Sequence, residues 1–357
     1  MIFKRAILRI YKWLGLFRIA LFFTKHRLRI VCYHGFALHD EADFRPRLFI
    51  RTETFNRRMD YLKRNGFRVV SLATGLKGLQ DGTLPKSAVV LTIDDGWAGV
   101  FERALPVLRR FTFPATIYIT SYFASKGSPV FRLIIQYLFW KTRNMQLSTT
   151  GLGLQLGEVV PIAATDDREH VVSTIMEFGE TELDEEGRCD LSRALADRLG
   201  VDYEELVRTR ILGLMNASEI RAVVEAGMDV QLHTHRHRLP NDRDLVRREI
   251  VDNRAFLEPL VGKELRHFCY PSGIWSKQQW PWLRELGIES ATTCVSGLNQ
   301  TDTPLLSLRR FLDGENVSDI EFEAELCGVS EMLRGCRVLL KRIFQRRDAL
   351  IESAPER

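Results

Sequence analysis

Two adjacent carboxylates, Asp94 and Asp95, follow an apolar, β-branched segment at residues 88–93. Such a segment is typical of a buried strand, and Gly96 behind the acids allows the backbone to turn. Because ligands bind at the carboxyl ends of strands in α/β folds, the pair is a candidate site. Two neighbouring acids repel each other and require a cation or a shared proton. The alternative is a plain helix N-cap, since residues 97–110 are expected to be helical.

Three of the eight histidines, His233, His235 and His237, follow a second expected strand at residues 228–232. Neutral imidazole is the commonest side-chain ligand of transition metals. On a helix-like turn His233 and His237 face the same way, whereas on a continuing strand His233 and His235 do. The alternative is a surface cluster of histidines without a ligand, which the position at a strand end disfavours.

These segments and a later turn resemble the three ordered motifs of the polysaccharide deacetylases, carbohydrate esterase family 4, also called the NodB-homology domain. The Thr-Phe-Asp-Asp-Gly motif is matched by Thr-Ile-Asp-Asp-Gly at residues 92–96. The His-Ser/Thr-x-x-His motif is matched at residues 233–237, and the aromatic-Pro-x-Gly turn by Tyr-Pro-Ser-Gly at residues 270–273. The resemblance covers roughly residues 28–315, and the ordered set is more specific than any single motif.

The resemblance implies a role for each matched residue. Asp94 corresponds to the general base, and Asp95, His233 and His237 correspond to the ligands of a divalent metal. Zinc is the first expectation, and cobalt, nickel or manganese suit the same ligands. His235 falls on a variable position of the motif and receives no role.

The chain lacks the histidine that serves as general acid in the commoner family pattern. The usual late Leu-x-His is missing, because no histidine follows His267. Members with a permuted motif order instead carry the general acid as a histidine at the end of the first strand. His34 resembles that histidine, because it follows the strand expected at residues 28–33. The alternative for His34 is a buried histidine that caps the strand.

Four further residues are candidates for supporting roles. The turn with Tyr270 and Ser272 is expected to offer a backbone N–H to the oxyanion; the alternative is a plain turn after a strand. Arg309 and Arg310 are candidates to orient Asp94, although an arginine on a barrel rim is more often simply solvated. The usual arginine of the third motif is also absent.

The implied activity is metal-dependent removal of N-acetyl groups from amino sugars of a polysaccharide or glycan, free or lipid-linked. Non-haem iron(II) oxygenases use a close His-x-Asp pair, and amidohydrolases an early His-x-His with later histidines; neither pattern fits. The alternative from another class is a catalytically idle glycan-binding or membrane-assembly protein that keeps the fold. Metal content and turnover separate these two hypotheses.

Strand and helix patterns alternate through most of the chain, which predicts an α/β fold, either a barrel or a doubly wound sheet. The resemblance to the polysaccharide deacetylases implies the first of these, a distorted (β/α) barrel, at residues 28–320. The alternation stops at about residues 125–214, where a mainly helical insertion is expected. Residues 321–357 are expected to form a basic helical tail. The net charge of +5 over 357 residues is mild and suggests no nucleic-acid partner.

Residues 1–27 are basic and apolar, with Phe3, Ile10 and Leu14 among the apolar residues at helical spacing. A basic amphipathic helix on a membrane surface is one hypothesis, and a helix packed on the domain's own core is the other. The six cysteines show no paired spacing and are interpreted as free thiols. The expected location is the cytoplasm, with peripheral contact to the inner face of the cell membrane; the oligomeric state stays open.

Overall fold

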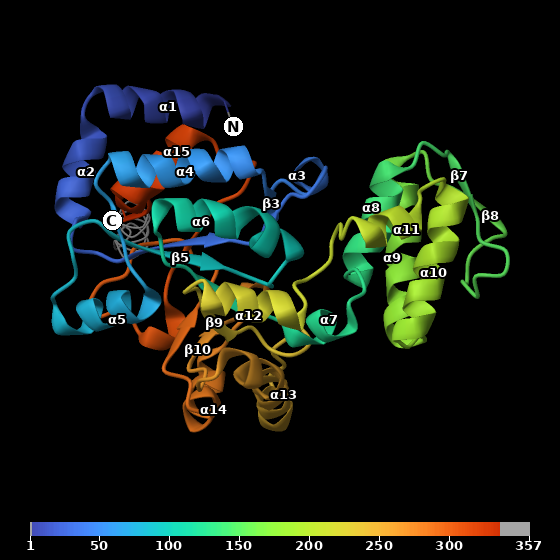
Figure 1. Ribbon diagram of the computed structural model, residues 1–357. Coiled ribbons are helices and arrows are strands. Elements are labelled where there is room, and N and C mark those ends of the chain that lie inside the picture. Colours follow the sequence, from blue (N-terminus) through green and yellow to red (C-terminus); the bar gives the residue numbers. More distant parts are fainter. Residues whose placement is uncertain (1, 336–357) are drawn as a thin grey trace, which may run out of the picture.

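The computed structural model describes residues 2–335 (Figure 1). Its centre is an eight-stranded sheet in the order β11-β10-β9-β6-β5-β1-β12, and β4 also pairs with β5. All these pairs are parallel. The strands are β1 (Arg29–Tyr33), β4 (Arg68–Val69), β5 (Ala88–Ile93), β6 (Thr116–Ile119), β9 (Asp229–Leu232), β10 (His267–Cys269), β11 (Ser290–Thr292) and β12 (Phe311–Leu312).

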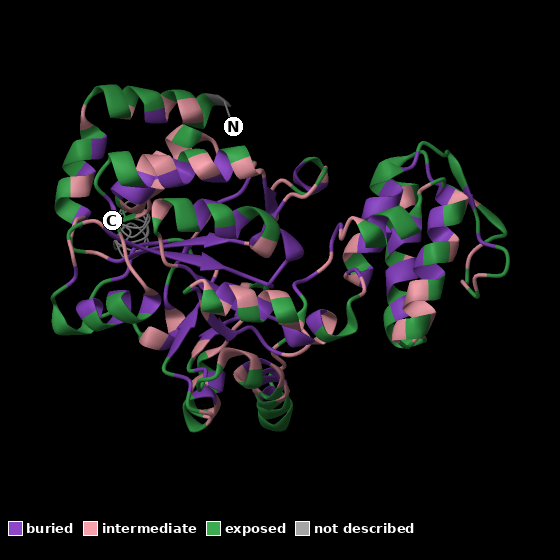
Figure 2. Cartoon of the chain, in the orientation of Figure 1, coloured by how far each residue is buried: buried purple, intermediate pink, exposed green. Residues whose placement is uncertain are grey.

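A parallel bridge between Thr292 and Leu308 joins β11 to the segment that leads into β12. The sheet therefore curls and closes on itself, and the expected distorted (β/α) barrel is confirmed. Because both faces of a parallel sheet are covered, its strands consist of continuous apolar residues. Every residue of β1 and β5 is buried, and Figure 2 shows the strands buried beneath the outer helices.

Helices that follow the strands cover the outside of the barrel. They are α4 (Thr52–Arg64), α5 (Leu72–Asp81), the π-helical turn η1 (Val100–Ala104), α6 (Leu105–Phe111), α7 (Ser121–Lys126), α12 (Ala217–Glu225), α13 (Arg243–Val261) and α14 (Trp280–Glu285). Short 3₁₀ turns lie at η2 (Pro271–Gly273), η3 (Lys277–Gln279) and η4 (Leu305–Ser307). Neither carboxylate of the Asp-Asp pair caps a helix, because the regular helix begins further along the chain.

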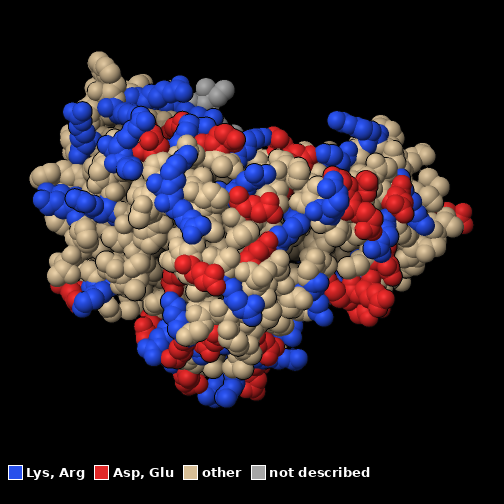
Figure 3. Space-filling view, in the orientation of Figure 1, with Lys and Arg blue, Asp and Glu red and all other residues tan. Residues whose placement is uncertain are grey.

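The mainly helical insertion is present and projects from one end of the barrel (Figure 1). It consists of α8 (Phe131–Lys141), α9 (Thr165–Thr181), α10 (Glu185–Leu199), α11 (Tyr203–Arg208) and a two-stranded antiparallel sheet of β7 (Gln146–Ser148) and β8 (Val159–Pro161). Acidic residues gather on its lower surface in Figure 3.

A small rim element connects the insertion to the barrel. It contains β2 (Gly35–Phe36), which pairs in parallel with β3 (Phe49–Ile50), and the short helix α3 (Glu41–Phe44). The Tyr137 hydroxyl on α8 donates a hydrogen bond of 2.7 Å to Asp40 beside α3. The Phe44 ring lies edge-on to Tyr137 at 5.4 Å. These contacts hold α8 against the barrel rim.

The prediction of one continuous helix at residues 1–27 is wrong, because two helices form there. Gly15 has a left-handed φ of 75° and separates α1 (Ile2–Trp13) from α2 (Leu16–Thr24). Both helices lie near α15 (Asp319–Cys327), the last labelled helix. Within residues 2–335 no helix combines the length and apolarity needed to cross a bilayer. The basic tail expected at residues 321–357 lies partly outside the described residues.

Candidate metal centre and active site

The candidate site lies at the carboxyl ends of the barrel strands. Asp94 and Asp95 follow β5, and both are buried. The backbone turns sharply here, because Asp95 has a φ of 71° and Gly96 a φ of 87°. This left-handed turn ends the strand's alternation, so that both acids are directed to the same end of the barrel.

Asp95 forms a compact cluster with two of the three histidines. Its Oδ1 atom lies 3.2 Å from Nε2 of His233 and 3.2 Å from Nε2 of His237. One ligand atom from each of the three residues falls within 4.8 Å of the other two. The other carboxylate oxygen of Asp95 accepts a 2.9 Å hydrogen bond from the indole N–H of Trp97, which fixes its orientation.

The histidine loop is tightly folded and held by α13. Thr234 and His237 both have left-handed φ angles, 63° and 54°. The backbone N–H of His233 donates to the side chain of buried Asn253 at 3.0 Å. Buried Glu249 accepts from the backbone N–H of Arg236 at 2.7 Å. This turn brings His233 and His237 to one side, which matches the helix-like alternative of their spacing.

His235 lies outside the cluster. Its Nδ1 atom is 2.8 Å from the Ser121 hydroxyl, and its backbone N–H donates to the Glu249 carbonyl at 3.1 Å. The side chain therefore packs towards α7 rather than towards Asp95. The alternative in which His233 and His235 share a face does not describe this loop.

The donor set fits a divalent cation. His233 Nδ1 lies 2.8 Å from the Cys269 carbonyl, so its protonated form donates there and Nε2 is directed at Asp95. Although burial lowers it, Cys269 and Asp95 raise the pKa of His233 well above its ordinary value. The buried Oδ1 of Asp95 has no hydrogen-bond partner within the described residues. A divalent cation would supply the positive charge that this arrangement otherwise takes from protons.

Asp94 is bound by Arg310. The fully buried guanidinium donates two hydrogen bonds to the carboxylate, at 2.7 and 2.8 Å, and a third to the Thr293 carbonyl at 2.9 Å. Burial alone would raise the pKa of Asp94, but Arg310 holds that pKa below its ordinary range. Arg309 instead lies half-exposed, with Glu331 as its ionic neighbour at 3.8 Å. Of the two arginines, the structure brings only Arg310 to Asp94.

Two buried thiols also contact Asp94. Cys32 and Cys269 lie 3.4 and 3.3 Å from its Oδ2 atom, at hydrogen-bond distance for a thiol donor. Burial raises the pKa of the Cys32 thiol, which keeps it protonated and able to donate. Inspection of the sequence missed these contacts. The sequence offers one indication of these contacts. Each cysteine lies at or next to the end of a strand, and the residues that follow that strand belong to the site.

His34 follows β1 and lies beside Asp94. Its Nε2 atom is 3.8 Å from Oδ2 of Asp94, and its Nδ1 atom is 4.0 Å from the Cys32 sulfur. The imidazole is mostly but not fully buried. The structure thus brings His34 to the same end of the barrel as both acids.

In the third motif, Ser272 lies near the site and the polar groups of Tyr270 do not. Ser272 has a left-handed φ of 55° and lines the cavity beside Asp95 and His237. Tyr270 is buried, and its hydroxyl donates to the Leu306 carbonyl at 2.9 Å. Its backbone N–H donates to the Thr292 carbonyl at 3.1 Å. Both polar groups of Tyr270 that the oxyanion role would need are therefore already used within the fold.

A cavity of about 300 Å³ opens beside the cluster. Its walls come from the barrel and from the insertion, whose start and first helix α8 contribute four residues. The lining residues are Leu48, Asp95, Trp97, Thr120, Phe123, Val130, Arg132, Leu133, Gln136, Leu214, His237 and Ser272. The insertion is therefore part of the candidate site and not only an appendage.

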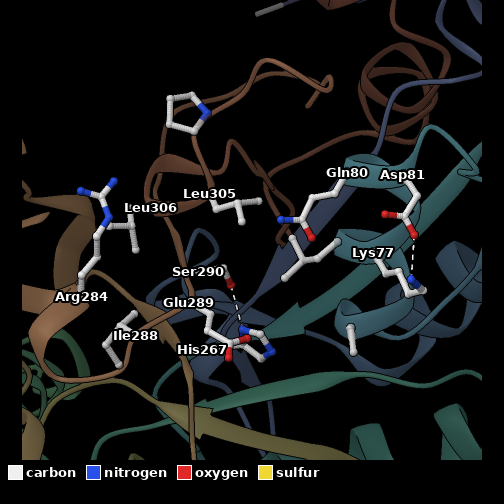
Figure 4. A pocket seen from close by; sticks show the side chains of 13 residues that line it. Lys77, Gln80, Asp81, His267, Arg284, Ile288, Glu289, Ser290, Leu305 and Leu306 are labelled. Carbon is white, nitrogen blue, oxygen red and sulfur yellow. Dashed lines mark hydrogen bonds and ion pairs between the residues drawn. The ribbon is translucent and has the colours of Figure 1, made fainter.

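A larger cavity of about 760 Å³ lies at the opposite, amino end of the strands (Figure 4). His267, the first residue of β10, lines it and lies 2.9 Å from the Ser290 hydroxyl. Lys77 and Asp81 form an ion pair on another wall. His267 therefore lies at the opposite end of the barrel from Asp94 and Asp95, because it begins β10 whereas the two acids follow β5.

Metal analysis of single variants tests the ligand set. We expect the purified protein to hold about one equivalent of a divalent metal. His233→Ala and His237→Ala should each lose most of it, because each removes one of three protein ligands. His235→Ala is the matched control and should retain the metal. Elemental analysis of the three proteins decides; loss in His235→Ala with retention in His237→Ala would contradict the assignment.

Comparison with known proteins agrees with this geometry. A family model described as polysaccharide deacetylase matches residues 81–138 and 202–291, which leaves most of the insertion unmatched. A poly-beta-1,6-N-acetyl-D-glucosamine N-deacetylase of Escherichia coli (strain K12) is 35% identical over 79 residues. That match spans 22% of this chain and only 12% of the relative's length.

Solved structures of deacetylases share the fold. Streptococcus pyogenes deacetylase PplD, in complex with acetate, aligns with a TM-score of 0.56 and 16% identity over 84% of this chain and 98% of its own. IcaB from Ammonifex degensii aligns with a TM-score of 0.51 and 18% identity over 84% of this chain and 97% of its own. At these identities the likeness concerns the fold.

Proposed function

Because the chain belongs to the polysaccharide deacetylase family, we propose that it is a metal-dependent hydrolase that removes N-acetyl groups from amino sugars of a glycan. The observation that carries the proposal is that the two adjacent acids have different partners. Asp95 lies among His233 and His237, whereas Asp94 is bound by Arg310. An oxygen of Asp94 nevertheless lies within 4.8 Å of a His233 ring nitrogen, close enough to act on the same water.

The residues of this chain can supply the parts that amide hydrolysis needs. Asp95, His233 and His237 would hold a divalent metal, which when bound would supply Lewis acidity for the acyl oxygen and lower the pKa of a water. Asp94 accepts the proton of the attacking water as the C–O bond forms. Protonated His34 donates a proton to the nitrogen as the C–N bond breaks, so that a neutral amine and acetic acid leave. The acetic acid ionises to acetate in solvent, and the proton held by Asp94 returns to His34.

Arg310 affects Asp94 in two opposite ways. The bidentate contact keeps the carboxylate ionised and oriented, with both oxygens near the end of β5. The same contact lowers its proton affinity, so Asp94 is a weak base on its own. As a weak base, Asp94 would need an attacking water of lowered pKa, which is the chemistry that a metal in the neighbouring cluster would supply.

The cavity supports a sugar-sized substrate. Its volume of about 300 Å³ is at the lower end of ordinary ligand pockets. Trp97, Phe123 and Leu133 offer apolar surface for an acyl group and a sugar face, and Arg132 and Gln136 on α8 offer polar contacts. We assign these two α8 side chains to substrate binding.

Metal identity, location and substrate form complete the proposal. Two histidines and one carboxylate with open positions are a common catalytic zinc set, so zinc is the proposed metal. Five cysteines of the described residues are free thiols, which supports a reducing, cytoplasmic location. Peripheral membrane contact and a lipid-linked glycan substrate are proposed together, because the first would place the enzyme beside the second.

Release of acetate tests the proposed function. We expect the metal-loaded protein to release acetate from at least one member of a panel of polymeric, oligomeric and lipid-linked N-acetylated sugars. A chelator should abolish the release and added Zn²⁺ should restore it, because the metal activates the water. Glycan binding without acetate release in the metal-loaded protein would instead favour the catalytically idle alternative.

A further inference from the structure

The amino-terminal helices α1 and α2 form a basic hairpin that packs on α15. Residues 1–27 contain seven Lys or Arg residues and no Asp or Glu. Phe17, Ala20 and Thr24 of α2 are buried. The Thr24 hydroxyl lies 3.2 Å from the Cys327 carbonyl and 2.8 Å from the Arg29 guanidinium. The hairpin is therefore firmly attached to the barrel.

The contact of α1 with α15 is partly ionic. The face turned towards α15 carries Lys4, Arg5 and Lys12. Lys4 and Arg5 lie 3.0 and 3.1 Å from the carboxylate of Glu321, and Lys12 pairs with Glu323. A helix that contributes to a hydrophobic core turns its apolar face inward. On α1 this inward strip is narrow, because Leu8 is buried and Tyr11 packs partly buried against the core, while the ion-paired side chains of Lys4 and Lys12 beside them stay largely exposed.

Many other apolar side chains of the hairpin are exposed to solvent. Phe3 is 79% exposed, Trp13 84% and Phe23 68%. The full set of exposed large apolar residues is Phe3, Ile10, Trp13, Leu14, Leu16, Ile19, Phe22 and Phe23. Eight such residues within one short hairpin form a patch of the kind that marks an interaction surface. Leaving these apolar side chains in contact with water is unfavourable compared with burying them, which favours a partner that covers them.

Cations flank this patch. Arg9 and Arg18 are exposed and have no ionic partner within residues 2–335, and Lys25 lies 3.9 Å above the Phe22 ring. Figure 3 shows Lys and Arg gathered over the region of α1 and α2. Residues 1–27 contribute no acidic side chain to this surface, although Asp319 and Glu323 of α15 lie beside Arg9 and Trp13. An apolar strip flanked by cations complements an anionic bilayer, because its apolar side chains can enter the acyl chains and its cations can contact the headgroups.

We propose that the α1–α2 hairpin docks flat on a bilayer that contains anionic lipid, with its exposed apolar side chains in the interface. Trp13, Phe22 and Phe23 are the main apolar anchors, and Arg9 and Arg18 contact the headgroups. Neither helix is long enough to span the bilayer, so the contact is peripheral. The proposal does not depend on catalysis, since binding is measured without substrate.

Cosedimentation with vesicles tests the docking surface. We expect the full-length protein to bind vesicles of equimolar phosphatidylglycerol and phosphatidylcholine more tightly than pure phosphatidylcholine. Trp13→Ser/Phe23→Ser should weaken this binding by at least about tenfold, because two aromatic side chains no longer enter the interface. Arg9→Gln/Arg18→Gln should weaken it roughly fivefold per cation and reduce its dependence on salt.

Two controls keep the result specific. Met145→Ser/Val159→Ser removes apolar side chains that are 64% and 58% exposed on the insertion, and it should bind as the unaltered protein does. Arg337→Gln/Lys341→Gln/Arg342→Gln alters the basic tail outside the described residues. Equal binding by the Trp13/Phe23 variant and the unaltered protein would overturn the proposal. So would a loss confined to the tail variant, or a vesicle-free dimer that the Trp13/Phe23 variant abolishes.

Discussion

Asp94→Asn is expected to lower kcat for deacetylation by roughly 10³–10⁴-fold while the metal stays bound. The amide keeps the shape of the carboxylate and one acceptor for Arg310, but it cannot take a proton from water. Asp94 lies outside the cluster of Asp95, His233 and His237, so metal content should not change. Paired measurement of turnover and metal content on one preparation gives the result.

The neighbouring acid provides the matched control for this variant. Asp95→Asn should weaken metal binding, because a neutral amide replaces the only anionic ligand in the cluster of three. Asp94→Asn also leaves the buried Arg310 without a counter-charge, which costs about 3–5 kcal/mol of stability. Thermal unfolding must therefore accompany the kinetics. A folded, metal-loaded Asp94→Asn enzyme with undiminished kcat would show that another group is the base.

Most of the cluster could be predicted from strand ends alone. Parallel strands direct their carboxyl ends to one edge, so Asp94 after β5, His233 after β9 and His34 after β1 had to lie together. The alternation of apolar strands with helices predicted a barrel or a doubly wound sheet, and the family resemblance favoured the barrel. Spacing left His235 and His237 as competing ligands, because a left-handed turn at Thr234 cannot be predicted from residue types.

Contacts between side chains across the barrel could not be predicted from patterns in the sequence. Arg309 and Arg310 are adjacent, and only the register of the last strand decides which one enters the barrel. Cys32 and Cys269 contact Asp94 from two strands that are distant in sequence. Tyr270 was expected at the oxyanion, but its hydroxyl and backbone N–H are used by Leu306 and Thr292. Such pairings depend on tertiary geometry, which no local pattern records.

The amino-terminal segment shows a different limit. Amphipathicity predicted a helix, and the same pattern suits a membrane surface and a protein core equally well. Which face is buried depends on what the helix meets. On this barrel α1 meets Glu321 and Glu323, which take up its lysines and leave Phe3 and Ile10 outside. The insertion likewise gave no sign in its sequence that α8 would line the cavity.

His34→Ala is expected to lower kcat by roughly 10²–10⁴-fold on an N-acetylated sugar while fold and metal content persist. Expulsion of an unprotonated amine from the intermediate is very unfavourable, so a residue must donate a proton. His34 lies 3.8 Å from Asp94 on the same end of the barrel, and its imidazole is not among the three proposed ligands. His267 cannot replace it, because it lines the cavity at the other end.

The leaving group separates a proton donor from a structural histidine. An aryl acetate releases a phenolate that needs little protonation, so His34→Ala should lose much less activity on this ester than on the amide. Asp94→Asn should lose activity on both substrates, because both need an activated water. The ratio of the two kcat losses in His34→Ala is therefore the decisive measurement. An equal loss on ester and amide would assign His34 to positioning Asp94, through the 3.8 Å contact, and the proton donor would have to be sought elsewhere.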